Sequence, residues 1–348
     1  MGKYIIVNAT ALDRSGALSI LRQFVENIPW DNRRWLVFVS PSVSITTDNP
    51  NVRIKPIEGV KPMHLRLLWD AFGLKKWLKH NDIDPIAAIS LQNTGFNVGK
   101  EVPSYIYYHQ PIPFFSFKWN PLKKQERIFW FYKNIYPLFV RLFLKKDTQV
   151  FVQLAFIKEG FTRRFGHNPD LVKVYSPSVV KPQEGTSVRN RLSDSLELIY
   201  PAMPHFYKNH RVIEESLKLM DVRVKIFFTF DASVETYRDP RIKLIGMQPY
   251  DRLCELYQTS DALLFPSYIE TYGLPLLEAA MTGLPIIASD LPYAREVLKG
   301  YEGVIFVKYD DPKAWAAAIK SLGKGKRYKP FSIAGRPGWK GLFSSIKA

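Results

Sequence analysis

The sequence predicts an α/β fold built from two domains with parallel sheets. Short β-rich runs alternate with longer amphipathic segments almost throughout the 348 residues, which is typical of repeated βα units. A polar stretch without apolar periodicity, residues 181–194, interrupts the alternation and has the composition of a linker. A chain of this length can also fill two cores of ordinary size. We therefore expect two α/β domains of similar architecture, residues 1–180 and 195–328, with a cleft between them.

The expected elements of the first domain begin with a strand over residues 4–7 and a helix over residues 16–28. Another helix is expected over residues 65–78, with one apolar face made by Leu67, Leu68, Ala71, Leu74 and Leu78. The remaining expected strands are residues 35–39, 85–91, 105–108, 150–152 and 172–174.

In the second domain, strands are expected over residues 196–200, 224–228, 242–245, 262–265 and 285–288. Helices are expected over residues 212–220 and 251–257, and from about residue 275 onward. The pattern again alternates, so this half predicts a second parallel sheet.

The composition limits the function classes. The chain is 46% hydrophobic and 23% charged, which is typical of a globular protein. Its single cysteine, Cys254, excludes an internal disulfide, provides no metal cluster and fits a reducing compartment. The N-terminus predicts no signal peptide, and no apolar run is long enough to span a bilayer. A net charge of +17 indicates a polyanionic partner, such as nucleic acid, an anionic membrane or a phosphorylated substrate.

The segment FPSYIETYGLPLLEAAMTGLPIIASD, residues 265–290, has the local chemistry of an anion site. Pro275 suits the first position of a helix, and Gly283 suits its end. Glu270 then lies in the strand-to-helix loop, and Glu278 lies about one turn inside the helix. Between them are unpaired backbone N–H groups at the positive end of the helix dipole, at the carboxyl edge of a parallel sheet.

Each of these two acids has two interpretations. Glu278 could accept two hydrogen bonds from a ribose diol, and Glu270 could bind the hydroxyls of a sugar beyond the phosphates. Alternatively, Glu278 only favours the helix dipole and Glu270 is a solvated loop acid. The spacing alone leaves both interpretations open.

The same segment resembles the signature of retaining family-4 (group 1) glycosyltransferases with the GT-B fold, of the bacterial surface-polysaccharide type. The match covers both glutamates, the aromatic-Gly-Leu-Pro turn, the Glu-Ala pair and the Gly-Leu-Pro before the next strand. YQTSDALLFPS, IGMQPYDRL and YPAMPHFYKNH resemble preceding elements of that family. The resemblance spans most of residues 196–320 and covers residues 1–180 only as general architecture. It implies two Rossmann-like, doubly wound domains that face each other across a cleft.

The resemblance implies a role for each matching residue of the second domain. Glu278 would hold the ribose of a nucleotide sugar, Glu270 would contact the donor sugar near the reacting carbon, and Lys208 would neutralise the departing diphosphate. Other donor-binding positions would be Thr271, Tyr272, Gly273, Leu274, Gly246 and Met247. The alternative for Lys208 is that it has no binding role and is a solvated lysine at the start of a helix.

One position departs from the family pattern. The family usually has an arginine five residues before this lysine, and here that position is Met203. His205, or a basic residue elsewhere, could supply the missing charge.

Two residues of the first domain are candidates for the acceptor side of the cleft. Gly16 follows the first strand, where the family brings backbone close to donor and acceptor, but it could equally be a plain loop glycine. His109 ends a strand in YIYYHQPIPF, where the family often has a histidine that contacts the transferred sugar or acceptor. Its alternative is a structural histidine at a strand end.

The mechanism implied is front-face transfer, in which the leaving phosphate takes the acceptor proton. The sequence shows no Ser-His-Asp or Cys-His arrangement that indicates a protein nucleophile. Asp82-Ile83-Asp84 is a literal D-x-D, the metal-binding pattern of the other large glycosyltransferase fold. It precedes Pro85 at a turn, where Asp is favoured for local reasons, so we expect no metal and no cofactor.

The basic charge is concentrated in residues 114–146, which hold eleven aromatic residues and eight Lys or Arg against one acid, Glu126. This mixture suits an anionic membrane surface, although nucleic acid or a core helix with snorkelling lysines would also fit it. The tail from Lys320 has eight Lys or Arg and no acid. Residues 329–348 form the expected C-terminal tail that returns toward the first domain, and within it Trp339 to Ile346 resembles the family's last helix.

The function expected is transfer of a sugar from a nucleotide-sugar donor to a lipid-linked saccharide, in particular one on polyprenyl diphosphate, in O-antigen, capsule or lipopolysaccharide synthesis. The enzyme would be cytoplasmic and peripheral on the inner face of the cytoplasmic membrane, with no nucleic-acid partner. The alternatives are a non-catalytic GT-B-like binding protein and a basic-aromatic nucleic-acid-binding protein.

Overall fold

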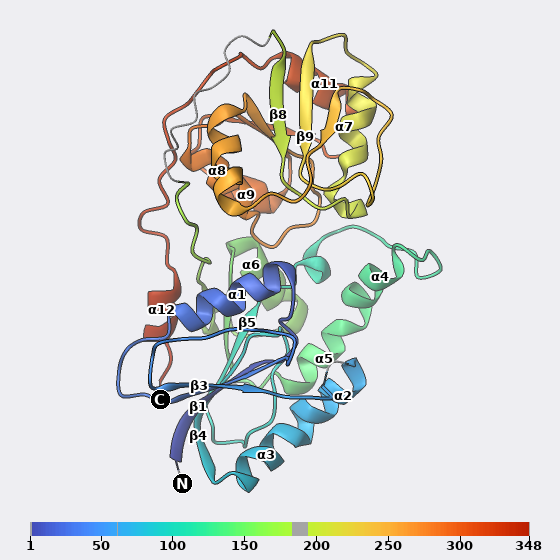
Figure 1. Ribbon diagram of the computed structural model, residues 1–348. Coiled ribbons are helices and arrows are strands. Elements are labelled where there is room, and N and C mark those ends of the chain that lie inside the picture. Colours follow the sequence, from blue (N-terminus) through green and yellow to red (C-terminus); the bar gives the residue numbers. More distant parts are fainter. Residues whose placement is uncertain (1, 61, 183–193, 348) are drawn as a thin grey trace. The chain divides into compact units, whose positions relative to one another are not determined.

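The computed structural model describes residues 2–60, 62–182 and 194–347 (Figure 1). The chain divides into two compact units. Unit 1 comprises residues 1–178 and 335–348, and unit 2 comprises residues 179–334. Most of the expected linker, residues 181–194, lies outside the described residues.

Unit 1 is built on a parallel seven-stranded sheet in the order β3-β2-β1-β4-β5-β6-β7. Its strands are β1 (Gly2–Ala9), β2 (Trp35–Val39), β3 (Val52–Pro56), β4 (Ile83–Ser90), β5 (Ser104–Tyr108), β6 (Gln149–Val152) and β7 (Val172–Val174). Its helices are α1 (Ser15–Glu26), α2 (Met63–Leu68), the π-helix η1 (Trp69–Gly73), α3 (Leu74–His80), η2 (Ile112–Phe114), α4 (Arg127–Asn134), α5 (Tyr136–Phe143), α6 (Ala155–Phe165), η3 (Pro169–Leu171) and α12 (Trp339–Ser344).

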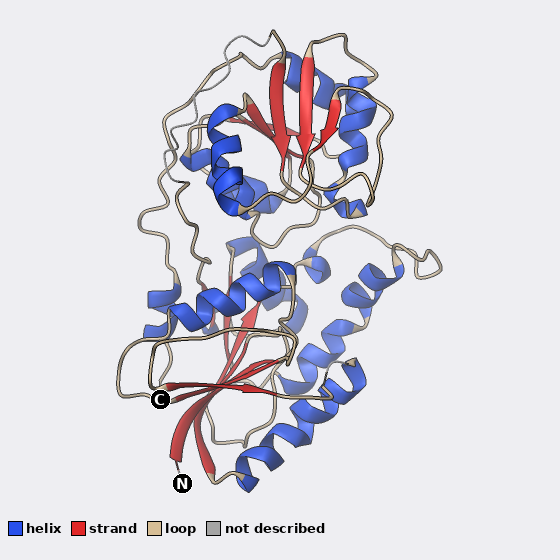
Figure 2. Ribbon diagram, viewed as in Figure 1, coloured by secondary structure: helices blue, strands red, loops and turns tan. Residues whose placement is uncertain are grey.

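The core of unit 1 follows from the alternation of side chains along the buried strands. On β1, Ile5 and Val7 face one layer and Tyr4 and Ile6 face the other. The first layer is covered by α1 and α12, and the second by α3 (Figure 2). In α12, Trp339 stacks on Tyr107 with ring centroids 5.3 Å apart. The C-terminal helix is therefore a part of the unit 1 core.

Unit 2 repeats the design with a parallel six-stranded sheet in the order β10-β9-β8-β11-β12-β13. Its strands are β8 (Leu196–Tyr200), β9 (Val224–Phe228), β10 (Ile242–Leu244), β11 (Ala262–Phe265), β12 (Ile286–Ser289) and β13 (Val304–Val307). Its helices are η4 (Phe206–Lys208), α7 (His210–Leu217), α8 (Tyr250–Thr259), α9 (Leu274–Met281), α10 (Pro292–Val297) and α11 (Pro312–Lys320). Helices α7 and α11 cover one face, and α8 and α9 cover the other (Figure 2).

Both sheets start in the middle, grow outward on one side and then return to the other side of the first strand. This order is that of a doubly wound, Rossmann-like sheet. The predicted fold class, two Rossmann-like doubly wound domains, is thus confirmed.

The expected helix over residues 65–78 was wrong in one respect. The helical segment contains one turn of π-helix, η1, between α2 and α3. Glycine is needed at position 73, because a Cβ there would lie 2.8 Å from the Trp69 ring. Asp70 of this turn is buried, while Leu68, which we expected on the buried face, is 56% exposed.

Candidate functional site

The site residues predicted in unit 2 lie in segments that follow its strands, either in loops or in helix α9. In a doubly wound sheet, ligands bind beyond the carboxyl ends of the strands where the winding reverses. In unit 2 this switch point lies between β8 and β11, which are neighbours. The loop after β8 carries Lys208, and the loop after β11 carries Glu270 and leads into α9.

Lys208 and Glu270 form an ion pair across these two loops. Their side chains are 18% and 14% exposed, so water screens the pair only in part. The loops are also joined through their backbones, since the N–H of Tyr268 donates to the carbonyl of Tyr207 at 2.9 Å. The hydroxyl of Tyr200, the last residue of β8, donates to the carbonyl of Lys208 at 2.8 Å. A cation and a carboxylate are therefore held in fixed positions at the switch point.

Helix α9 begins beside this pair. Gly273 stands before its first residue with φ of 78°, a left-handed conformation that favours glycine. Pro275 is in the first turn, and no side chain caps the helix N-terminus. In the turn before the helix, Tyr272 is buried and Thr271 is half-buried. The N-terminal N–H groups of α9 therefore give the switch point a partial positive charge.

Glu278 lies one turn inside α9 and contacts helix α8. Its Oε2 accepts a hydrogen bond from the hydroxyl of Tyr257 at 2.9 Å. Burial raises the pKa of Glu278 to about 7, and the Tyr257 hydrogen bond opposes that rise. The carboxyl group is therefore close to half ionised at neutral pH, and sequence reasoning did not identify its partner Tyr257.

The remaining candidates of unit 2 follow β10. Gly246 has φ of 72°, and its N–H donates to the carbonyl of Phe230 in the loop after β9. Met247 is 75% exposed. These residues therefore lie at the carboxyl edge of the sheet, on the β9–β10 side.

Met203 and His205 lie in the loop that leads to Lys208. Met203 is 37% exposed and carries no charge. His205 stacks on Tyr207 with ring centroids 5.5 Å apart. Burial, and then the charge of Lys208, lower the pKa of His205, which favours its neutral form at pH 7.

Gly16 and His109, the acceptor-side candidates, both belong to unit 1. Gly16 is the second residue of α1, and a Cβ there would meet nothing within 4 Å. His109 follows β5, its Nε2 donates to the carbonyl of Leu91 at 2.9 Å, and its N–H donates to Oδ1 of Asn93 at 2.6 Å. Burial lowers the pKa of His109, so its imidazole is neutral at pH 7 and Nδ1 is the acceptor nitrogen.

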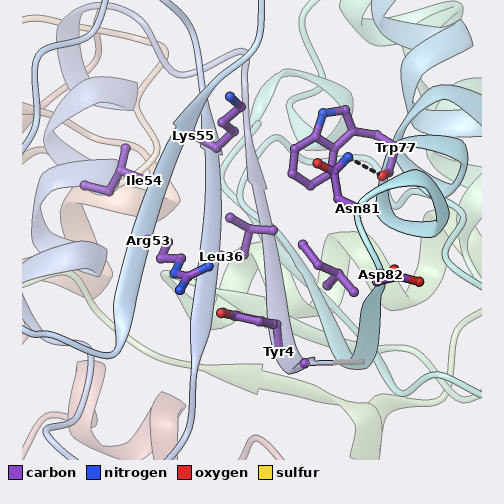
Figure 3. A pocket seen from close by; sticks show the side chains of 10 residues that line it. Tyr4, Leu36, Arg53, Ile54, Lys55, Trp77, Asn81 and Asp82 are labelled. Carbon is purple, nitrogen blue, oxygen red and sulfur yellow. Dashed lines mark hydrogen bonds between the residues drawn. The ribbon is translucent and has the colours of Figure 1, made fainter.

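A pocket of about 570 Å³ lies in unit 1 (Figure 3). Its lining includes Tyr4, Arg53 and Asp82, at or near the amino ends of β1, β3 and β4, and Trp77 of α3. The pocket is therefore at the opposite edge of the sheet from the carboxyl ends of the strands. Asp82 of the D-x-D is in the left-handed turn before β4, with φ of 51°. Among the residues that the structure describes, no group of three or more His, Cys, Asp or Glu could hold a metal ion.

The comparisons with known proteins place the glutamate segment in a family. Residues 236–335 match the family model described as glycosyl transferases group 1. The resemblance to group 1 glycosyltransferases is confirmed. This group 1 segment contains Gly246, Met247, Glu270 and Glu278, whereas Lys208 precedes it.

A curated relative is the O-antigen chain mannosyltransferase RfbU of Salmonella typhimurium, 25% identical over 202 residues. The match covers 55% of this chain and 56% of that protein, so the chain spans about half the length of this relative. Among solved structures, sucrose-phosphate synthase from Thermosynechococcus elongatus has a TM-score of 0.66 at 14% identity, covering 99% of this chain and 92% of that one. Anabaena HepE, solved with UDP and glucose, has a TM-score of 0.62 at 14% identity, with coverages of 92% and 89%. The structural likeness shows that the fold is GT-B.

Proposed function

We propose that this protein is a retaining group 1 glycosyltransferase. It would move a hexose from a nucleotide-sugar donor to a lipid-linked saccharide, in O-antigen, capsule or lipopolysaccharide synthesis. The observation that carries the proposal is the Lys208–Glu270 pair at the switch point of unit 2, beside the N-terminus of α9 and one turn from Glu278. The relative RfbU, an O-antigen chain mannosyltransferase, and the HepE complex with UDP and glucose support it.

Each part of a nucleotide sugar then has a chemical counterpart in unit 2. The diphosphate binds the N–H groups of α9 and the ammonium of Lys208, and the ribose diol binds the ionised carboxylate of Glu278. When Lys208 turns to the phosphate, Glu270 needs new hydrogen-bond donors, and the hydroxyls of the donor sugar supply them. The donor therefore replaces one ion pair by two sets of charge-assisted hydrogen bonds.

Catalysis in this proposal rests on positioning and on charge stabilisation at the departing diphosphate. Lys208 and the α9 N-terminus stabilise the negative charge that develops on the leaving phosphate, and that phosphate takes the proton of the acceptor hydroxyl. Neutral His109 in unit 1 would contact the acceptor or the transferred sugar through a hydrogen bond. No metal or cofactor is assigned a step, so we expect activity to persist in the chelator EDTA.

The membrane surface is proposed as the place of the acceptor. Helices α2 and α4 contain no buried residue, although α2 is rich in apolar side chains and α4 in aromatic ones. Leu138 and Leu142 of α5 are 57% and 69% exposed, and Phe72 of η1 is 70% exposed. The same helices carry exposed basic residues, including Arg127 of α4 and Arg141 of α5. The aromatic residues of α4 are half-buried, and α5 buries Tyr136, Pro137 and Val140. The exposed leucines and Phe72 support the membrane interpretation, with rings and leucines at headgroup depth and cations on anionic lipid.

No helix in the described part of the chain is long and apolar enough to cross a membrane. The exposed apolar and basic residues of α4 and α5 lead us to propose a peripheral location on the cytoplasmic face. The test compares binding to vesicles of anionic phosphatidylglycerol and of neutral phosphatidylcholine. Changing Leu138 and Leu142 to Ser should weaken binding to the anionic vesicles at least tenfold. The matched control changes Leu219 and Val234 of unit 2, which are 45% and 54% exposed. Equal losses in both variants would refute the assigned surface.

The donor reaction is tested by nucleotide release from a panel of nucleotide sugars, with lipid-linked saccharides as acceptors. Glu270→Gln should abolish turnover of the donor that the unaltered protein uses. Glu215→Gln is the control, because Glu215 forms an exposed ion pair with Arg211 on α7. Binding of a donor without turnover would favour a non-catalytic protein. If no donor binds, and RNA binding survives loss of Glu270 and Glu278, the glycosyltransferase proposal fails.

A further inference from the structure

A second buried polar cluster lies in unit 1 and has no role in the donor chemistry above. Its centre is Asp70, which the π-turn η1 places in the interior with no solvent exposure. The carboxylate accepts from Nδ2 of Asn8 at 2.7 Å and from Nε2 of Gln92 at 3.0 and 3.1 Å. Burial raises the pKa of Asp70 to about 7, against the hydrogen bonds of Asn8 and Gln92 and the charge of Arg66.

This cluster lies at the switch point of the first sheet. Asn8 is near the end of β1 and Gln92 follows β4, and β1 and β4 are the neighbours between which the winding reverses. The carboxyl edge at such a point is where doubly wound sheets bind ligands. A π-turn inside a helix is also frequent at functional sites. The cluster therefore lies beneath the expected ligand edge of unit 1.

The carboxylate determines which way both amides face. As an acceptor only, it turns both NH2 groups toward itself, so both amide oxygens face away from it. Oε1 of Gln92 then accepts from the N–H of Ala11 at 3.2 Å and lies 3.2 Å from the hydroxyl of Thr10. Oδ1 of Asn8 is a second acceptor for that hydroxyl, at 3.1 Å. The hydrogen bonds of Thr10 and Ala11, in the β1–α1 loop of residues 10–14, thus depend on the carboxylate at position 70.

We propose that Asp70 is a positioning residue that fixes the β1–α1 loop through Asn8 and Gln92, and thereby sets the affinity of unit 1 for the acceptor saccharide. The acceptor part of this inference rests on the proposed function. The loop part does not, because it concerns hydrogen bonds within unit 1.

The variant Asp70→Asn tests the orientation argument. With its oxygen at the Oδ1 position, the new side chain still accepts from both Asn8 and Gln92, but its NH2 group takes the place of Oδ2 and faces the NH2 group of Gln92. A flip of the Gln92 amide relieves this contact and presents a donor to the N–H of Ala11. The double variant Asp70→Asn with Gln92→Glu restores the pattern, because a carboxylate at position 92 accepts from the new amide, from Thr10 and from Ala11.

The first measurement is hydrogen–deuterium exchange of the full chain at about pH 8, where the Asp70 carboxylate is the main form. Asp70→Asn should speed exchange at Ala11 about tenfold or more, and the double variant should restore slow exchange. The control Thr148→Val removes a buried hydroxyl that bonds Ser104 at the amino edge of the same sheet, 2.7 Å away. Exchange at Ala11 that is unchanged in Asp70→Asn, or equally fast in Thr148→Val, would overturn the positioning role.

The second measurement separates the two substrates, using polyprenyl-diphosphate-linked monosaccharides as acceptors. Asp70→Asn should raise the KM for the acceptor about tenfold and leave the donor dissociation constant within about twofold, with recovery in the double variant. An unchanged acceptor KM overturns the link to the acceptor. If the unaltered protein uses no acceptor and binds no donor, the proposed function fails, while the exchange result still decides the loop argument.

Discussion

Glu278 gives the most quantitative prediction, because its ionisation should control donor binding. Hydrogen bonds from a ribose diol require the carboxylate, and burial raises the pKa of Glu278 to about 7. A carboxyl with that pKa is about 9% ionised at pH 6 and about 91% ionised at pH 8. The apparent affinity scales with the competent fraction, so binding should be about tenfold tighter at pH 8, or about 1.4 kcal/mol. Donor binding should weaken, and not strengthen, as the pH falls from 8 to 6, because Glu278 takes up a proton over this range and loses the charge that the diol requires.

The assay is calorimetric titration with UDP-glucose or another donor that binds, at about pH 6 and about pH 8. A nucleotide sugar suits this purpose because its diphosphate diester does not titrate between these values. The variant Glu278→Gln cannot ionise, so it should bind weakly with little dependence on pH. Tyr257→Phe removes the hydrogen bond that opposes the rise in the Glu278 pKa and should move the transition to higher pH. A slope that persists in Glu278→Gln would refute the reasoning.

Three further predictions concern unit 2. Burial lowers the pKa of His210 to about 3, so between pH 3 and pH 6.5 the unfolded state binds more protons than the folded state. The free energy of unfolding therefore falls as the pH is lowered from 7 to 5. The variant His210→Phe should make this fall smaller by about 2 kcal/mol, measured by urea unfolding at the two pH values. Gly273→Ala should cost more stability than Gly166→Ala in the same assay, since both are left-handed but only the new Cβ at position 273 would contact Leu276, at 3.1 Å. Lys208→Met should lower the melting temperature by leaving Glu270 unpaired in a half-buried loop, and adding Glu270→Gln should restore most of it without restoring turnover.

The elements around α9 could be predicted from the sequence because their signals are local. Strand β11 occupies the expected residues 262–265, and α9 begins one residue before Pro275. An apolar run, a Gly-Leu-Pro turn and a closing Gly283 are sufficient for that pattern. Strands β3 and β13 and helices α10 and α11 were not anticipated, and β3 is half polar, with only Val52 buried. Its place is determined by pairing with β2 and not by its own sequence.

The candidate site could be predicted only as a set of separate residues. Glu270 and Lys208 are 62 positions apart, and their contact depends on β8 and β11 being neighbours in the sheet. Neither the Tyr257 partner of Glu278 nor the burial that raises its pKa leaves a sequence signal. Asp70 shows the same limit more sharply. A regular helix over residues 65–78 predicts an apolar face that includes Leu68, whereas in the structure Leu68 is 56% exposed and Asp70 is buried.

The resemblance to the family predicts an arginine at position 203, where this chain has Met203. Burial lowers the pKa of the nearby His205, and Glu270 pairs with Lys208. The switch point of unit 2 therefore offers a diphosphate little free positive charge until the pair opens. Opening the pair leaves Glu270 without a cation, and a half-buried carboxylate without partners is costly. In the proposed donor complex the sugar hydroxyls remove that cost, whereas a nucleotide diphosphate without its sugar would not. On this reasoning the pair favours the intact donor over the nucleotide product, because loss of the sugar allows Lys208 and Glu270 to join again.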